Sequence, residues 1–323
     1  MNAVVSLDSI VTIGNQLNRP ECVLAFSDGS LCTADWRGGV NVMRDSSHSL
    51  IRAANIDFDL RPNGISMMSD GSFLIAHLGE SNGGLFRLMD NGHCEPLLTE
   101  VDGESLPPSN FPHIDRSGRI WLTISTRRIP RATAYRSDVT DGFIVLIDAG
   151  VARVVADNLG YTNECCVSPD GHFLYVNETF ARRLSRFRIL PNGDLIEKSV
   201  VTEFDVGTFP DGLTFDEHGD IWITSIISNR VIRCTTDGEQ TLILEDANDD
   251  HIHWVETAFL RHSLGREHLD TGGGILLGNI SSLAFGGPDL KTAYLGCLLD
   301  DKVYAFESRV AGMPPVHWNY RVP

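Results

Sequence analysis

The chain has 323 residues, of which 42% are hydrophobic and 21% are charged, and its formal net charge is -17. Because this composition is ordinary for a globular protein, it allows a full hydrophobic core and excludes a largely disordered chain. The acidic charge repels phosphate backbones and anionic lipid, so we expect neither nucleic acid nor a membrane as a partner. An acidic protein is also suited to hold a cation.

The seven cysteines form no CxxC pair and lack the dense spacing of a secreted disulfide scaffold. The first residues show no basic leader with an apolar core of signal-peptide length, and no later stretch approaches the roughly 20 apolar residues of a membrane span. We therefore expect a soluble, cytoplasmic protein with reduced thiols, present as a monomer or a small homo-oligomer.

A repeated offset is the main structural signal in the chain. Six times, a polar residue stands eight positions before the Gly or Asp of a turn, with an apolar stretch between them. These units recur at intervals of roughly 40 to 50 residues, which is typical of a radially repeated β-sheet. The pairs are Glu21 and Gly29, Asn63 and Gly71, Asn110 and Gly118, Asn163 and Gly171, Asp211 and Gly219, and, more loosely, Ser281 and Asp289.

Each unit has the pattern of a blade with three or four short strands. Two strands joined by a tight turn come first, as in CVLAFSDGSLCTAD, and a third strand and an outer strand follow. We predict an all-β, six-bladed β-propeller with a central metal-binding channel, forming one domain over residues 1–323. A pair of β-sandwiches is the alternative, which the sixfold offset disfavours. The predicted blades cover residues 20–55, 56–105, 106–157, 158–203, 204–246 and 276–310, and residues 4–14 are expected to add an outer strand that closes the ring.

Other positions of the repeat predict packing rather than chemistry. Trp121, Tyr175 and Trp222 occupy equivalent places in the second strands, so we expect them to pack between blades. The adjacent Cys165 and Cys166 lie in an apolar strand and are predicted to be core residues.

An insertion at about residues 246–274 separates the fifth and sixth units. Its centre, residues 253–264, has the apolar spacing of a short helix that Gly265 would end. Long loops in compact domains are often functional, so the insertion is either a lid over the site or a surface decoration.

The polar residues of the offset predict a metal site. In a propeller they begin the innermost strands and converge on one axis, and Glu21, Asn163 and Asp211 would supply two carboxylates and a carboxamide. Such oxygen ligands favour calcium, with magnesium, manganese or zinc as alternatives. A cation with an open coordination position polarises a carbonyl or phosphoryl oxygen, so hydrolysis of an ester-like bond is the reaction class that follows.

Two stretches carry the most specific motifs, NxxxxSPDGxxLYVNET in the fourth unit and PDGLTFDxxGDIWIT in the fifth. With NRPECVLAF, RPNGISMMSDG and SNFPHIDRSGRIWLT, they resemble the blade openings of the gluconolactonase, regucalcin (senescence marker protein) and luciferin-regenerating-protein family. The resemblance extends from about Asn18 to Phe306. It implies a six-bladed propeller with one divalent metal in the channel and a lactone as the small-molecule substrate.

The resemblance also implies roles for individual residues. Glu21, Asn163 and Asp211 would bind the metal, Asp211 would act as general base with its pKa lowered by the metal, and Asn110 would reach the substrate or the metal. The expected reaction opens a small, sugar-derived or other lactone to its hydroxy acid. The alternatives are hydrolysis of phosphotriesters or aryl esters, and a non-catalytic calcium-binding propeller.

One position departs from the family pattern. Sugar lactonases have an arginine two residues before the asparagine of the third blade, whereas this chain has Pro108. Polar contacts to the substrate would then come from Asn63, His113 or His77. The basic stretch from Thr126 to Arg131 is too short, against the acidic net charge, to predict nucleic-acid binding.

Overall fold

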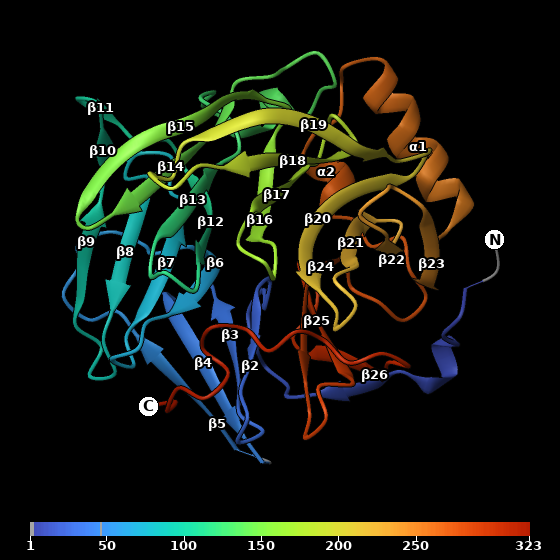
Figure 1. Cartoon of the computed structure of the whole chain (residues 1–323). Helices are drawn as coiled ribbons and strands as arrows, with labels where there is room; N and C mark the ends of the chain where they lie inside the picture. Colours follow the sequence, from blue (N-terminus) through green and yellow to red (C-terminus); the bar gives the residue numbers. More distant parts are fainter. Residues whose placement is uncertain (1–2, 46) are drawn as a thin grey trace.

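The computed structural model describes residues 3–45 and 47–323, which form mainly β-strands (Figure 1). The glycines of the repeated offset close tight turns between antiparallel strands. Gly29, Gly71, Gly118, Gly171 and Gly219 all have positive φ, between 77° and 89°. Glycine reaches this region without the penalty that a Cβ imposes, so these positions determine where the first two strands of each unit turn back.

Within the described residues, six four-stranded antiparallel sheets lie around one axis (Figure 1). In the first five sheets the strands follow chain order from the axis outward, so each is a blade of a propeller. Their strands are β2 (Val23–Ala25), β3 (Leu31–Asp35), β4 (Gly39–Arg44) and β5 (Ser47–Arg52); β6 (Pro62–Met67), β7 (Phe73–His77), β8 (Gly84–Leu88) and β9 (Cys94–Leu98); β12 (Ser109–Ile114), β13 (Ile120–Ile124), β14 (Gly142–Asp148) and β15 (Val151–Leu159); β16 (Thr162–Val167), β17 (Phe173–Glu178), β18 (Arg183–Ile189) and β19 (Leu195–Glu203); and β20 (Thr208–Phe215), β21 (Ile221–Ile227), β22 (Arg230–Cys234) and β23 (Gln240–Glu245).

The sixth blade joins the two ends of the chain. It consists of β24 (Ile280–Gly286), β25 (Thr292–Cys297), β26 (Val303–Glu307) and, at its outer edge, β1 (Val11–Ile13). β1 runs antiparallel to β26, with Val11 opposite Ala305. The predicted closing strand is therefore confirmed, and the β-sandwich alternative is wrong.

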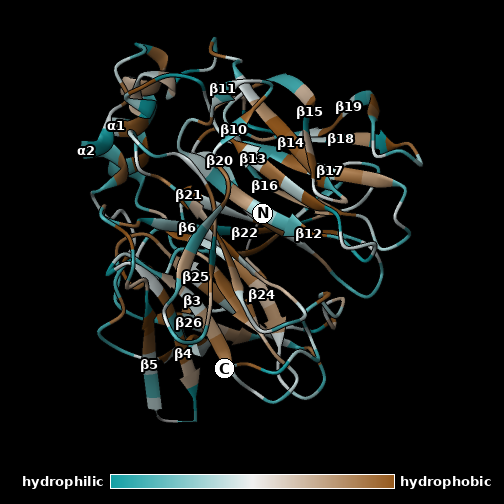
Figure 2. Ribbon diagram, turned by 90° about the vertical axis from the view of Figure 1, so that its left-hand side faces the viewer, coloured by the Kyte–Doolittle hydropathy of each residue, from teal (hydrophilic) through white to brown (hydrophobic). Residues whose placement is uncertain are grey.

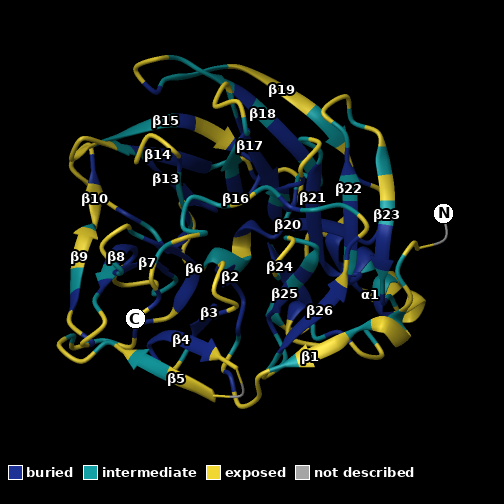
Figure 3. Ribbon diagram, turned by 60° about the horizontal axis from the view of Figure 1, so that its bottom comes forward, coloured by how far each residue is buried: buried dark blue, intermediate teal, exposed yellow. Residues whose placement is uncertain are grey.

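The blades pack face to face through their apolar side chains. Figure 2 shows hydrophobic residues along the strands, and Figure 3 shows that the inner strands are buried while the outer strands are largely exposed. Trp121 packs with residues of the fourth blade, Tyr175 with residues of the fifth and Trp222 with residues of the sixth. The predicted packing of these aromatic residues between blades is confirmed.

The insertion contains two helices, α1 (Asp249–Leu260) and α2 (Arg266–Leu269). The predicted helix over 253–264 exists, but its bounds are wrong by four residues at each end. It begins earlier because the Asn248 side chain accepts a hydrogen bond from the His251 N–H at 3.0 Å, an N-cap that apolar spacing does not reveal. In the described part of the chain, no helix has both the length and the apolar character needed to cross a membrane.

Short elements and the C-terminal tail complete the molecule. The tail crosses one end of the propeller axis, where the Met313 N–H donates to Phe215 O at 2.9 Å and Trp318 O accepts from Ser27 N–H at 2.8 Å. This tail has no counterpart in the repeated pattern. The remaining elements are η1 (Leu7–Ser9), η2 (Arg131–Ala134) and the two-stranded β10 (Glu100–Val101) and β11 (Glu104–Ser105).

Candidate metal centre

The six residues of the repeated offset form what we call the ring: Glu21, Asn63, Asn110, Asn163, Asp211 and Ser281. Five of them lie just before or at the second residue of an innermost strand, Asp211 is the fourth residue of β20, and all six are buried. We call this end of the channel the mouth, and the opposite end, where the repeated turns lie, the turn end.

β-bulges interrupt the strand pairing at the ring in five of the six blades. The register of the innermost strand shifts across Asn63, Asn110, Asn163, Asp211 and Ser281. A bulge breaks the strict alternation of a strand and re-aims its side chains, and bulges are common beside functional sites. The bulges explain why these polar side chains are not directed into the apolar packing between blades.

Three ring residues from distant parts of the chain interact with one another. Glu21, Asn163 and Asp211 are 7%, 5% and 5% exposed, respectively. The Asn163 amide and the charge of Glu21 both act on the Asp211 carboxyl. The structure thus brings together the three residues that the sequence predicted as metal ligands.

Buried oxygen atoms of the ring lack partners. Asn110 Oδ1 and Asn163 Oδ1 have no hydrogen-bond partner within the described residues, and Glu21 Oε2 has only the ion pair with Arg19 Nε at 3.4 Å. The amide nitrogens are fixed, since Asn110 Nδ2 donates to Ser125 Oγ and Asn163 Nδ2 to Thr179 Oγ1, each at 3.0 Å. A buried acceptor without a partner is costly, so these atoms fit a cation that coordinates oxygen.

The chemistry of the donors favours a hard cation. Among residues 3–45 and 47–323, no three His, Cys, Asp or Glu side chains are grouped to hold a metal ion. A site at the ring would therefore need carboxamide oxygens beside its two carboxylates. Calcium accepts such mixed oxygen ligands, whereas structural zinc sites are built from Cys and His.

The electrostatics of Asp211 reflect this crowding. Burial, followed by the charge of Glu21, raises the pKa of the Asp211 carboxyl well above its ordinary value, while Arg19 and Arg131 act in the opposite direction. A divalent cation beside the carboxylate would favour the ionised form and reverse the direction of the shift. The predicted lowering of the Asp211 pKa thus concerns the metal-bound site.

The other two ring residues tie neighbouring blades together. Asn63 Nδ2 donates to Asn110 O at 3.2 Å, and Ser281 Oγ donates to Glu21 O at 2.7 Å. Gly212 allows the close approach of the fifth and sixth blades, because a Cβ there would lie 2.5 Å from Ser281 O. These contacts hold the backbone of the ring in place.

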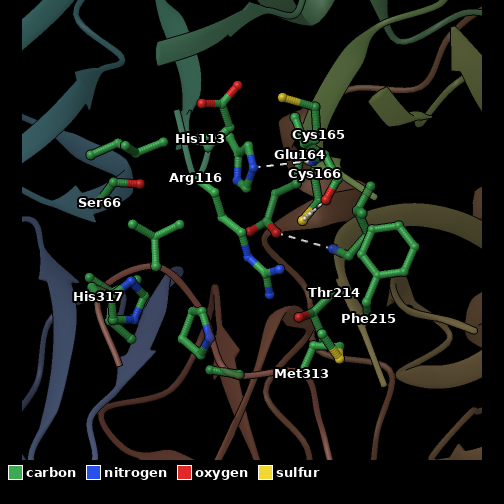
Figure 4. Close-up of a pocket in the computed structure, with 18 of the residues that line it drawn as sticks. Ser66, His113, Arg116, Glu164, Cys165, Cys166, Thr214, Phe215, Met313 and His317 are labelled. Atoms are coloured by element: carbon green, nitrogen blue, oxygen red, sulfur yellow. Dashed lines mark hydrogen bonds between the residues drawn. The ribbon is translucent and has the colours of Figure 1, made fainter. Parts of the chain in front are cut away.

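His113 lies below the ring, in a cavity of about 230 Å³ toward the turn end (Figure 4). His113 Nε2 accepts from the Val167 N–H at 3.1 Å, and burial lowers the pKa of His113 to about 4. Glu164 lines the same cavity, accepts from the Leu213 N–H at 3.1 Å, and has its pKa raised by burial. The C-terminal tail, residues 313–317, closes the wall of this cavity.

His77 does not join the ring. Its Nδ1 accepts from the Arg61 N–H at 2.9 Å, and its ring packs against Phe58 and Phe86 at centroid distances of 5.1 and 5.6 Å. Burial lowers the pKa of His77 to about 4, so it is neutral at physiological pH. These contacts lie within the second blade, which makes His77 a packing residue there.

The insertion packs over one side of the mouth. Phe259 of α1 contacts Phe180 and Phe209, and the buried cluster around them includes Tyr135 and Tyr161. Tyr161 and Phe209 stand two positions before Asn163 and Asp211, so the cluster lies next to the ring. The insertion is therefore part of the packed core at the mouth rather than a loose surface decoration.

Two arginines at the ring were missed by the sequence analysis. Arg19 Nε lies 3.4 Å from Glu21 Oε2, and Arg131 Nε donates to Tyr161 OH at 2.9 Å. Arg19 stands two positions before Glu21, the place that carries an arginine in the third blade of sugar lactonases, so the sequence held a signal for it. Arg131 carried no such signal, because only the folded loop after β13 places it beside the ring.

Together these features define a six-bladed β-propeller with a group of buried carboxylate and carboxamide side chains at one end of its axis. The chain belongs to the SMP-30/gluconolactonase/LRE-like family, whose model matches residues 19–246. Among solved structures, the gluconolactonase XC5397 of Xanthomonas campestris is 18% identical with a TM-score of 0.68, covering 92% of this chain and 89% of that one. The calcium-binding protein regucalcin of Agrobacterium tumefaciens is 18% identical with a TM-score of 0.67, covering 96% and 95%.

Two curated relatives are lactonases. The 6-deoxy-6-sulfogluconolactonase of Pseudomonas putida is 27% identical over 54% of this chain and 57% of its own length, and pentonolactonase XacC of Haloferax volcanii is 24% identical over 67% and 64%. Strictosidine synthase-like proteins of Arabidopsis thaliana also match, at 25% to 28% identity. The chain spans between about a third and two thirds of the length of the curated relatives it matches.

Proposed function

We propose that this protein is a metal-dependent hydrolase that opens a small lactone to its hydroxy acid. The observation that carries the proposal is the pair of buried, unpartnered oxygen atoms on Asn110 and Asn163, beside the carboxylates of Glu21 and Asp211. Such atoms fit a divalent cation, and calcium is the first choice because hard oxygen ligands suit it. Two relatives named as lactonases and a structural neighbour named as calcium-binding support the same function.

Glu21, Asn163 and Asp211 would hold the cation, which when bound would polarise the lactone carbonyl. We assign Asp211 the role of accepting the proton of the attacking water, because it is a ring carboxylate beside Asn163 and is buried from bulk solvent. Asn110, whose buried Oδ1 has no hydrogen-bond partner, would orient the substrate.

Other residues prepare the site without touching the reacting atoms. Thr179 Oγ1 accepts from Asn163 and donates to Pro210 O at 2.8 Å, which fixes the orientation of the Asn163 amide. Asn63 and Ser281 position the neighbouring backbone. The substrate we propose is a small molecule, acted on in the cytoplasm by a monomer or small homo-oligomer.

The proposal is tested by measuring the hydrolysis of a panel of lactones, aryl esters and phosphotriesters, with acid release recorded in a pH-stat. We expect lactone hydrolysis that a chelator abolishes and that added calcium restores. Glu21→Gln should lower the rate by a factor of about 100 or more, since it removes a ligand charge, whereas Glu100→Gln, an exposed acid on β10, should not.

Each alternative has its own outcome. Activity confined to phosphotriesters or aryl esters would replace the proposed reaction. Calcium binding without turnover of any substrate would indicate a non-catalytic propeller. Lactone hydrolysis that persists undiminished in metal-free protein would contradict the role assigned to the ring.

A further inference from the structure

Arg131 is held beside the ring with part of its guanidinium unused. Its Nε donates to Tyr161 OH at 2.9 Å and its Nη2 donates to Ser125 Oγ at 3.3 Å. No carboxylate lies within ion-pair distance of Arg131 in the described chain. Because a guanidinium has five N–H donors, three of them remain for a ligand.

Ser125 connects Arg131 to Asn110. The Ser125 hydroxyl oxygen accepts from Asn110 Nδ2 at 3.0 Å as well as from Arg131 Nη2. Arg131 thus stands next to the ring residue of the third blade, the blade in which Pro108 replaces the arginine of sugar lactonases. Arg131, in the loop after β13, therefore supplies a guanidinium to this blade from a different sequence position.

Arg19 places a second guanidinium at the first blade. It lies over the Trp36 ring, with its Cζ atom 4.4 Å from the ring centroid, and its Nε is 3.4 Å from Glu21 Oε2. The backbone of Arg19 has φ of 53°, in the left-handed region that non-glycine residues rarely adopt.

The charges at the ring do not balance once a divalent cation is bound. Glu21 and Asp211 contribute two negative charges, Arg19 and Arg131 contribute two positive charges, and the cation adds two more. Glu164 interacts with both carboxylates and adds at most one further negative charge, with its pKa raised by burial. The site would then carry a formal excess of about one to two positive charges in the middle of a protein whose net charge is -17. A neutral substrate leaves this excess uncompensated, whereas an anionic substrate offsets it.

We propose that Arg131, assisted by Arg19, recognises an anionic substituent on the lactone, so that the substrate class is lactones that carry an acidic group. A guanidinium with several free donors suits the paired oxygens of such a group. The inference rests on the proposed lactonase function and makes Arg131 a specificity-determining residue of the same site.

Kinetics with a matched pair of lactones tests the inference. Glucaro-1,4-lactone carries a carboxylate, and glucono-1,4-lactone is its neutral counterpart with the same ring size. We expect the wild-type, calcium-loaded protein to prefer the anionic lactone by about tenfold or more in kcat/KM, through a lower KM. Arg131→Met should remove most of that preference, a reduction of about tenfold, and Arg131→Lys, which keeps the charge but not the planar guanidinium with its paired donors, should restore part of it.

Arg128→Met is the matched control, because Arg128 lies in the same loop but pairs with Asp141 at 3.5 Å with about half of its side chain exposed. It removes the same charge and should keep the preference. An unchanged preference in Arg131→Met, or an equal loss in Arg128→Met, would overturn the inference.

Binding of the reaction products separates this inference from the proposed function. Calorimetry on the calcium-loaded protein should show tighter binding of glucarate than of gluconate in wild type, and a contrast reduced by about tenfold or more in Arg131→Met. If the protein hydrolyses neither these two lactones nor any other lactone of the panel, the proposed function fails, and the product-binding contrast still decides whether Arg131 recognises an acidic group. Equal affinities of wild type for the two products would reject it.

Discussion

Replacing Asp211 by asparagine keeps the shape of the side chain and removes one of the two carboxylates at the ring. In the absence of metal, burial and the charge of Glu21 disfavour the ionised Asp211, so Asp211→Asn should leave the metal-free protein as stable as wild type or more so. With metal the effect reverses, because the lost carboxylate is a ligand. The substitution therefore has opposite effects on stability in the two states.

The size of this effect follows from binding linkage. At a calcium concentration about 100 times the wild-type Kd, binding stabilises the fold by about 2.7 kcal/mol. A chain of 323 residues has an unfolding entropy of about 0.7 kcal/mol/K, so its Tm should rise by about 4 °C. If Asp211→Asn weakens binding by about 100-fold, only about 0.4 kcal/mol remains at the same concentration, and Tm should rise by less than about 1 °C.

Scanning calorimetry with and without calcium measures both quantities, and Asp205→Asn is the control, since Asp205 is exposed and lies in the loop just before β20. Hydrolysis of lactones by Asp211→Asn should fall by a factor of about 100 or more. A calcium-dependent rise in Tm as large as that of wild type, together with retained hydrolysis, would refute the assignment of Asp211 as ligand and base.

Three further predictions concern the surroundings of the site. Phe259→Ala should destabilise the fold by about 3 to 5 kcal/mol in chemical denaturation, because Phe259 is buried in the aromatic cluster of the insertion; a change near zero would show that α1 is a loosely attached lid. Gly212→Ala should cost about 1 to 3 kcal/mol and weaken calcium binding, since its Cβ would lie 2.5 Å from Ser281 O, and unchanged stability and affinity would contradict this tight contact. His113 has a pKa lowered to about 4, so the folded state binds fewer protons than the unfolded state between about pH 6.5 and 4, and stability is lost as pH falls through this window. In acid-denaturation curves, the free energy of unfolding of His113→Gln should fall by about 3 kcal/mol less than that of wild type over this pH range. A dependence on pH as steep as that of wild type would argue against a buried neutral imidazole.

Most of the fold could be predicted from the sequence because its signals are local. Turn glycines with positive φ, such as Gly29 and Gly219, and apolar strands on either side specify each hairpin without reference to the rest of the chain. The closing strand near Val11 was also predictable, since a propeller needs its last blade completed. The N-terminus of α1 was not, because it depends on the Asn248 cap rather than on apolar spacing.

The site was predicted only in part, for a physical reason. Ring residues such as Asn163 share a fixed place in the repeat, but the β-bulge in β16 disturbs the alternation, so the adjacent Glu164 enters the channel as well. His113 could not be placed from its spacing, because it lies toward the turn end, below Asn110. Arg131 reaches the ring through a loop and two side-chain hydrogen bonds that no periodicity encodes.

The central claim is that oxygen atoms of Glu21, Asn163 and Asp211 hold one divalent cation at the mouth of the channel. Anomalous diffraction from crystals grown with manganese, and a matching data set with calcium, would locate the ion directly. We expect a single strong peak on the propeller axis within about 2 to 2.6 Å of oxygens from all three residues. A channel without a peak in crystals soaked at saturating metal, or an ion bound elsewhere with the three side chains uninvolved, would contradict the account.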